Sequence, residues 1–312
     1  MRTEWVIHIW GKEREKLELT SQEKFHMDMI KNFDHSIFDK VLINIAMCDI
    51  NNNSLFELLK RELMNVFSDV KEVDIRKCQN DRTLCEYVTF RPYVWDRIGE
   101  NVRIFYSHFK GYISNVRIGY SENEYPMRTI LINELYWSYL MYRMSLSKEY
   151  VYEMKMSFDA GGDVYCWCLL DKTYLEEPQG GAFYTSYFRN LEESVPDIKK
   201  FYVNESEGVF SPGSFVWYDM NNIYRHIGEF INDISLDSEV LKNAGLSSHY
   251  CELYIWRFLN SENVYEQTRI NNMKKQFATI QNTPYTKIYC SKKVCKEYIK
   301  DFDKYIIKNK II

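Results

Sequence analysis

The stretch Val41-Leu42-Ile43-Asn44-Ile45-Ala46 decides the fold class, because so short and apolar a run is typical of a strand buried on both faces. Similar β-type runs occur at residues 6–10, 70–75 and 102–106. Two stretches with a helical spacing of apolar residues lie between them, at 54–67 and 82–98. Strands that alternate with helices predict an α/β fold with a mostly parallel sheet covered on both faces.

The second half of the chain is patterned less regularly. A long helix is expected at about 127–145. Glycine and proline turns then separate short aromatic-rich segments, such as 164–170 and 215–218. Helical signals return at 219–234, 238–244 and 248–259. Loops between short aromatic segments often form one wall of an enzyme cleft.

No internal repeat and no Gly/Ser/Pro-rich linker divides the chain, so we expect one domain over residues 1–286. It would have a sheet half at about 1–125 and an irregular half at 126–286. The remaining segment, 287–312, has eight lysines against three acids and apolar residues at roughly helical spacing. It predicts a basic helix, which either packs its apolar stripe on the domain or lies on an anionic membrane surface.

Composition excludes several classes of protein. The 312 residues are 46% hydrophobic, enough to bury a substantial core, and the net charge of −4 gives no basic field that would collect nucleic acid. The apolar run at 6–10 is too short for a signal peptide, and no run approaches the roughly 18 residues of a membrane-spanning helix. We therefore expect a soluble, cytoplasmic protein.

Polar residues follow the predicted strands. In parallel sheets ligands bind beyond the carboxyl ends of the strands, which draws attention to Gly11 with Lys12, to Asp49 with Asn51, and to His108 with Lys110. Two potential cations followed by a glycine, Gly111, suit a diphosphate. The alternative is that His108 is a hydrogen-bonded structural histidine and that Lys110 is a solvated surface charge.

Several short motifs occur together in one order. They are Phe105-Tyr106-Ser107-His108-Phe109-Lys110-Gly111, Gly213-Ser214-Phe215-Val216-Trp217 and His249-Tyr250-Cys251-Glu252-Leu253-Tyr254, preceded by Ile7-His8-Ile9-Trp10-Gly11 and Glu86-Tyr87-Val88-Thr89-Phe90. The chain thereby resembles, over about residues 5–259, a group of bacterial glycosyltransferases of capsular and exopolysaccharide loci. That group carries (F/Y)YxHxKG and G(N/S/T)FxW motifs.

The resemblance implies a GT-A-type fold, in which residues 1–125 bind the nucleotide and residues 126–286 form the acceptor side. The expected reaction moves a hexosyl group from a nucleotide-diphosphate sugar to a glycan or polyprenyl-linked acceptor of a bacterial surface polysaccharide. The donor-binding candidates are His8, Trp10, Gly11, Asp49, Glu86, His108, Lys110 and Gly111. Ser214 and Trp217 are acceptor-binding candidates, and core packing explains Trp217 equally well.

The chain departs from the common GT-A pattern, because no Asp-x-Asp pair ends a central strand to hold Mg²⁺ or Mn²⁺. Two alternatives stay open. In one, His108 and Lys110 offset the diphosphate charge without a metal. In the other, Glu86 or Asp49 binds a metal weakly.

Glu252 is the candidate base for an inverting transfer, with His249 one helical turn before it. A helix-capping role explains Glu252 as well. Two further readings of the whole chain belong to other classes. A catalytically silent member would bind glycan or protein through its tyrosines. A metal-dependent hydrolase ranks last, because the six histidines show no HxH or HxxxH spacing.

Overall fold

The structure, a computed structural model, describes residues 1–109, 141–143, 145–166 and 214–228. It also describes the short pieces 138, 192–193, 231–234, 239–240, 277–279 and 289–291. The first 109 residues form β1 (Arg2–Gly11), α1 (Ser21–Ile30), η1 (His35–Ile37), β2 (Lys40–Met47), α2 (Asn53–Val66), β3 (Val73–Gln79), α3 (Tyr87–Tyr93), η2 (Trp95–Arg97) and β4 (Val102–His108). The later elements are α6 (Lys148–Asp159), β5 (Val164–Cys166), β6 (Val216–Asp219), α9 (Met220–Ile227), α10 (Ile231–Ile234), β7 (Phe277–Thr279) and β8 (Tyr289–Ser291).

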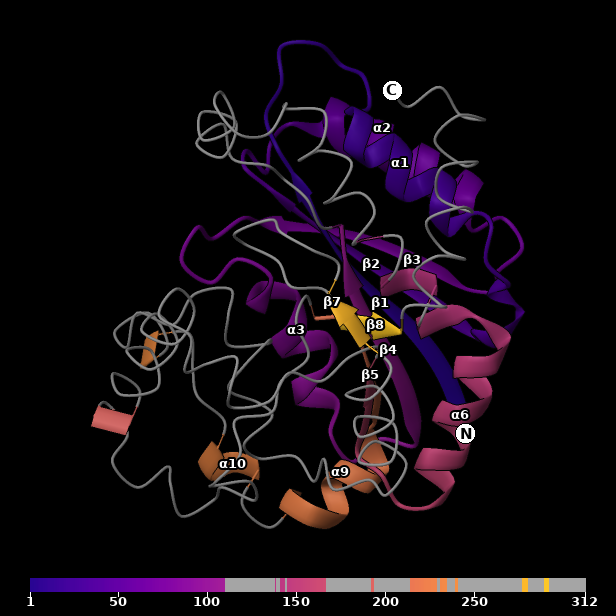
Figure 1. The fold of residues 1–312 in the computed structure, drawn as a ribbon. Helices are drawn as coiled ribbons and strands as arrows, with labels where there is room; N and C mark the ends of the chain where they lie inside the picture. The colour runs from indigo at the N-terminus through magenta and orange to yellow at the C-terminus, as the bar shows by residue number, and fades with distance from the viewer. Residues whose placement is uncertain are drawn as a thin grey trace.

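A mixed six-stranded sheet organises the fold, with strand order β3-β2-β1-β4-β6-β5 (Figure 1). The four strands of the first half are parallel to one another, as the alternating pattern predicted. β6 pairs antiparallel with β4, and β5 pairs antiparallel with β6. β7 and β8 form a separate antiparallel pair. Segments on either side of a long sequence interval thus share one sheet.

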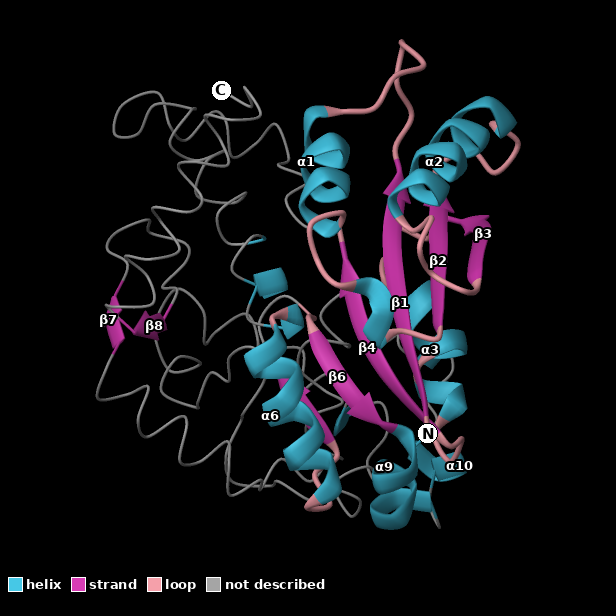
Figure 2. Cartoon of the chain, turned by 90° about the vertical axis from the view of Figure 1, so that its right-hand side faces the viewer, coloured by secondary structure: helices cyan, strands magenta, loops and turns pink. Residues whose placement is uncertain are grey.

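Helices cover both faces of the sheet. In Figures 1 and 2, α1, α2 and α6 lie on one face and α3 lies on the other. The hydrogen bonds agree, because Thr89 of α3 bonds to His8, whose neighbours Ile7 and Ile9 point to the opposite face. The fold class predicted from the sequence, α/β with flanking helices, is confirmed.

An aromatic cluster fills the core on the α1, α2 and α6 face. Trp5 lies 5.4 Å from Phe105 and 5.1 Å from Phe38, measured between ring centroids. Trp217 of β6 stacks on the same two rings, at 4.9 Å from Phe105 and 5.5 Å from Phe38. All four rings are at least 96% buried. This cluster joins β1 and β4 to β6, so β6 shares one core with the strands of the first 109 residues.

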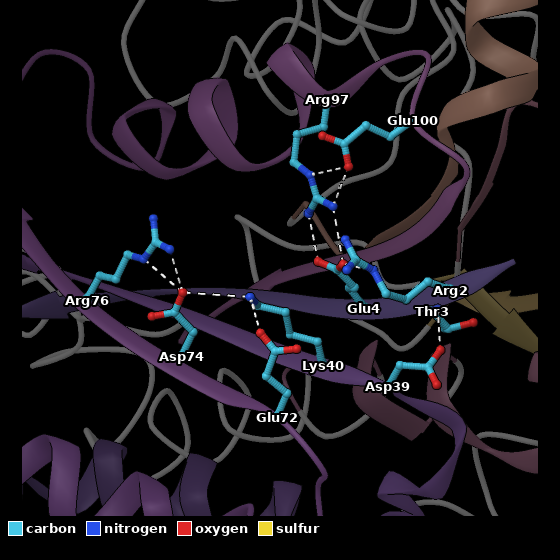
Figure 3. Close-up of polar contacts among 10 residues, drawn as sticks. All are labelled: Arg2, Thr3, Glu4, Asp39, Lys40, Glu72, Asp74, Arg76, Arg97 and Glu100. Atoms are coloured by element: carbon cyan, nitrogen blue, oxygen red, sulfur yellow. Dashed lines mark hydrogen bonds and ion pairs between the residues drawn. The ribbon is translucent and has the colours of Figure 1, made fainter.

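The amino ends of the strands are tied together by ion pairs (Figure 3). Glu4 of β1 is fully buried and binds Arg97 at 2.7 Å and 3.2 Å, and Arg97 also binds Glu100 at 2.7 Å. Lys40 of β2 lies between Glu72 and Asp74. On the other side of β1, Arg103 of β4 joins the buried Asp219 at 3.0 Å to Asp159 at 2.7 Å. The buried Glu4 and Asp219 at this edge therefore each have a partner of opposite sign.

Several expected boundaries are confirmed and others are shifted. The helix expected at 54–67 is α2, capped by the Asn52 side chain, which accepts from Leu55 N. The strand expected at 70–75 begins only at Val73, because Val70 N bonds to Phe67 O in the turn that ends α2. The helix expected at 82–98 is shortened to α3 and η2, with Pro92 inside α3.

Among the described later residues, the short segments expected at 164–170 and 215–218 contain β5 and β6, and the helix expected at 219–234 contains α9 and α10. The helix α6 was not expected. The basic helix expected at 287–312 lies outside the described residues except for Tyr289–Ser291, which is a strand. None of the described helices combines the length and the apolar character needed to cross a membrane.

Candidate functional site

The order of the parallel strands reverses between β1 and β4. The chain passes from β1 outward to β2 and β3, and then returns to β4 on the other side of β1. In open α/β sheets, ligands bind at such a switch point.

A row of polar side chains crosses this switch point on the face that α3 covers. Asn44 of β2 pairs in register with His8 of β1, and His8 pairs with His108 of β4. Residues at the same level of adjacent strands point to the same face, so the three side chains stand side by side. All three lie within three residues of the ends of their strands.

α3 contributes two polar groups that lie over this row. Thr89 Oγ1 lies 2.7 Å from His8 Nδ1 and accepts from Asn44 Nδ2 at 2.9 Å. Burial lowers the pKa of His8 from 6.5 to about 4, together with repulsion from His108 and against the attraction of Glu86. His8 is therefore neutral at physiological pH, with Thr89 fixing the orientation of its ring.

Glu86 stands at the start of α3 and pairs with His108. Its Oε2 lies 3.1 Å from His108 Nδ1 and accepts from the Tyr106 hydroxyl at 3.2 Å. The Glu86 side chain is 6% exposed and that of His108 is 12% exposed. Glu86 therefore links the imidazole of His108 to the hydroxyl of Tyr106 at the start of α3.

Three buried polar atoms beside this group have no hydrogen-bond partner among the described residues: His108 Nε2, Asn44 Oδ1 and Ser214 Oγ. Ser214 precedes β6. The next residue, Phe215, has its ring 5.8 Å from the His108 ring, which places this segment beside His108. Buried polar groups in folded proteins are nearly always hydrogen-bonded, so three buried polar atoms without a partner in one region suggest that a ligand supplies their hydrogen bonds.

Backbone strain occurs at the same place. Cys85 (φ 46°) and Ser214 (φ 53°) are the two non-glycine residues of the described chain with positive φ. Cys85 immediately precedes Glu86, and Ser214 opens the segment that runs beside His108. Strained residues of this kind concentrate at functional sites, because the strain holds a neighbouring group in a required position.

The loops after β1 and β2 hold the remaining described donor-site candidates. Trp10 Nε1 donates to Cys48 Sγ at 3.1 Å. A Cβ on Gly11 would lie 2.5 Å from Met47 Sδ and 3.2 Å from Ile45 Cγ2, so a larger residue here would require the side chains between β1 and β2 to shift. Asp49 is exposed and accepts from Asn51 N at 2.9 Å, which makes it a turn residue. These three residues support the edge of the sheet beside the histidine row.

Trp217 requires a correction. It was a candidate for lining an acceptor site, with core packing as the equal alternative, and the structure shows core packing: the ring is fully buried and its Nε1 donates to Ser145 O at 3.0 Å. A sugar cannot reach a ring enclosed in this way. Alternating strand residues point to opposite faces, and the motif on β6 therefore gives its aromatic residue to the core.

Four predicted site residues lie outside the described residues: Lys110, Gly111, His249 and Glu252. Asn44, Thr89 and Tyr106 belong to the observed cluster, and sequence reasoning missed them as functional residues. Asn44 carried a signal, because it is the one polar residue inside the apolar run 41–46. Thr89 and Tyr106 carried none beyond their place in the quoted motifs.

The described cluster can hold an anion or move a proton through His108. Within the ranges that the structure describes, no group of three or more His, Cys, Asp and Glu side chains could hold a metal ion. Comparisons of the chain with protein-family models, with curated proteins and with solved structures found no match.

Proposed function

We propose that this protein is a glycosyltransferase of GT-A type whose nucleotide-sugar donor binds at the carboxyl edge between β1 and β4. One observation supports this above the others. The motif segments 7–11, 86–90, 105–108 and 214–217 lie far apart in the sequence, yet they meet at one place in the fold. Their polar members His8, Glu86 and His108 lie together near the carboxyl ends of β1 and β4, which supports a binding role for this place.

The chemistry of the meeting place suits a nucleotide donor. It lies at the switch point of a parallel sheet, where nucleotides bind in α/β folds. It presents a histidine whose second nitrogen has no partner among the described residues, and a neutral histidine stands beside it. A diphosphate offers oxygen acceptors to such groups.

The rest of the proposed reaction draws on the sequence. A hexosyl group would pass, with inversion, to a glycan or polyprenyl-linked acceptor in bacterial surface polysaccharide synthesis, with Glu252 as base and His249 beside it. We propose that the diphosphate is stabilised by His108 and Lys110, with weakly bound Mg²⁺ or Mn²⁺ as the alternative. The protein would act in the cytoplasm, with residues 287–312 at the inner face of the membrane.

The test is a thermal-stability screen against UDP, GDP, CDP and TDP, each with and without Mn²⁺. A ligand that binds only the folded state raises the melting temperature, and at a hundredfold excess over Kd it adds about 2.7 kcal/mol. We expect one nucleotide to give a shift that Lys110→Ala abolishes. Arg61→Ala, on the exposed side of α2, is the matched control and should keep the shift.

The other outcomes also decide. A shift that appears only with Mn²⁺ favours the metal-dependent form of the proposal. No shift with any nucleotide in either condition contradicts the proposal. The catalytically silent glycan- or protein-binding protein then becomes the better account.

A further inference from the structure

We propose that Asn44, Thr89 and His8 form a hydrogen-bond chain with one direction. The chain leaves the ring hydrogen of a neutral His8 on Nε2, where it donates to an acceptor oxygen of the bound nucleoside diphosphate. Asn44 and Thr89 are positioning residues in this arrangement, because they act on the ligand through His8. The identity of the ligand rests on the proposed function, whereas the direction of the chain rests on the geometry of the three side chains.

The chain begins at the side-chain amide of Asn44, which is 1% exposed. Its Nδ2 donates to Thr89 Oγ1 at 2.9 Å and to Cys78 Sγ at 3.3 Å, so both amide hydrogens have an acceptor. An amide turned end for end would give up both of these acceptors in a buried place, which is costly. Asn44 therefore acts as a donor toward Thr89.

The hydroxyl of Thr89 carries this direction on to His8. A hydroxyl has one hydrogen to donate, and its oxygen accepts through its lone pairs. Because Thr89 Oγ1 accepts from Asn44, its own hydrogen is available for His8 Nδ1 at 2.7 Å. A neutral imidazole whose Nδ1 accepts a hydrogen bond carries its hydrogen on Nε2. Burial lowers the pKa of His8 to about 4, which agrees with a neutral ring.

His8 is the end of the chain that is most accessible to a ligand. Asn44 and Thr89 are almost completely buried, whereas His8 is 7% exposed. His8 also lies at the switch point, level with His108 of β4. Thr89 engages Nδ1, so Nε2–H is the polar group of this ring that can bind a ligand. A neutral N–H donor suits an acceptor oxygen, either on a phosphate group or on the nucleoside.

The first measurement is nitrogen-15 NMR of the His8 ring in the full-length protein without ligand, with His8→Gln to assign its signals. We expect one tautomer, in which Nε2 is protonated and Nδ1 is unprotonated and hydrogen-bonded. Thr89→Val keeps the shape of the side chain and removes the hydroxyl, so the Nδ1 signal should move to the position of a nitrogen without a hydrogen bond. Thr89→Ser should restore it. Thr83→Val, the same substitution at an exposed residue before α3, is the control and should leave the signal unchanged.

The second measurement is the affinity, by calorimetry, for whichever of UDP, GDP, CDP and TDP gives the largest stability shift, for its nucleoside and for inorganic pyrophosphate. Thr89→Val should bind the nucleoside diphosphate about three- to tenfold more weakly, as expected for one impaired hydrogen bond. Thr89→Ser should bind it as the wild type does. An equal loss for pyrophosphate places the acceptor oxygen on a phosphate group, and a loss for the nucleoside places it on the base or ribose.

The failures of the two proposals are distinguishable. A protonated Nδ1 of His8 in the wild type would overturn the chain, whether or not a nucleotide binds. If the nucleotide binds equally well to the wild type and to folded Thr89→Val, the role of the chain in binding is wrong while the donor site stands. If His8 has the expected tautomer and no nucleotide binds, the nucleotide-sugar function fails and the direction of the chain stands. Near-ultraviolet circular dichroism of each variant establishes that it is folded.

Discussion

The two ends of the central strands bury polar and charged side chains in different ways. At the amino end, the buried Glu4 has Arg97 and the buried Asp219 has Arg103 (Figure 3 shows the first pair). At the carboxyl end, His108, Asn44 and Ser214 keep buried polar atoms that no described residue satisfies. Both ends belong to one sheet and one core, so their difference does not arise from the fold class.

The difference separates stability from function. Completed ion pairs hold a structure in place and leave no group for a ligand. Unsatisfied groups and two left-handed residues cost stability, and they persist when a bound ligand or a required geometry offsets that cost. The comparison predicts that mutations at the amino end change stability alone, whereas those at the carboxyl end change ligand binding.

The largest effect is expected at the amino end. Glu4→Gln removes the buried carboxylate that pairs with Arg97, so the largely buried Arg97 guanidinium keeps only Glu100 as an ion-pair partner. Breaking a buried pair in this way should lower the free energy of unfolding by about 3 kcal/mol, measured by urea denaturation. Arg61→Ala on α2 is the control and should change it by less than about 0.5 kcal/mol. A loss for Glu4→Gln as small as that of the control would contradict the account of this edge.

A smaller effect tests His8 at the carboxyl end. The pKa of His8 is about 4 in the folded protein, compared with an ordinary value of 6.5. At pH values between these two, His8 binds a proton in the unfolded chain but not in the folded protein. The stability is therefore complete above about pH 6.5 and falls as the pH drops toward 4, by about 3 kcal/mol at most. Denaturation over this range should show a flatter pH profile in His8→Gln than in the wild type. Identical slopes would mean that His8 is not buried as a neutral group.

The smallest effect has the opposite sign. Cys85→Gly removes the strain of the positive φ at the residue before Glu86. The extra conformational entropy of glycine in the unfolded chain offsets part of this gain. The free energy of unfolding should therefore rise by about 1 kcal/mol. Cys85→Ala removes the thiol but keeps the Cβ, so it should give no gain. If the strain holds Glu86 in place, the glycine variant should also bind the nucleoside diphosphate more weakly. If Cys85→Gly gains stability and binds the nucleoside diphosphate as tightly as the wild type, the backbone strain at Cys85 has no role in binding.

The sequence predicted those features that depend on local pattern. The apolar run 41–46 and the periodicity at 54–67 correspond closely to β2 and α2. α1 was missed, although Thr20 and Glu23 form a capping box whose spacing is visible in the sequence. The weak apolar patterning of its ten residues concealed it.

The candidate site was predictable only in part, because it is built from long-range pairings. The strand ends pointed to His108, and Glu86 was quoted as a helix start, but their 3.1 Å contact spans 22 positions and depends on how α3 packs on the sheet. The same limit explains the error at Trp217. Which face of β6 meets the core follows from its register with β4, and no residue within the motif encodes that register.

The most direct test of the central claim is nitrogen-15 NMR of the histidine rings during titration with the nucleoside diphosphate. His35 is an internal reference, because both of its ring nitrogens are already bonded, to Asp69 and to Ile30 O. We predict that the Nε2 signal of His108 shifts on nucleotide binding, while His8 stays neutral and His35 does not change. Saturable nucleotide binding that leaves His108 unchanged would contradict the claim that the unsatisfied carboxyl end of the sheet is the binding site.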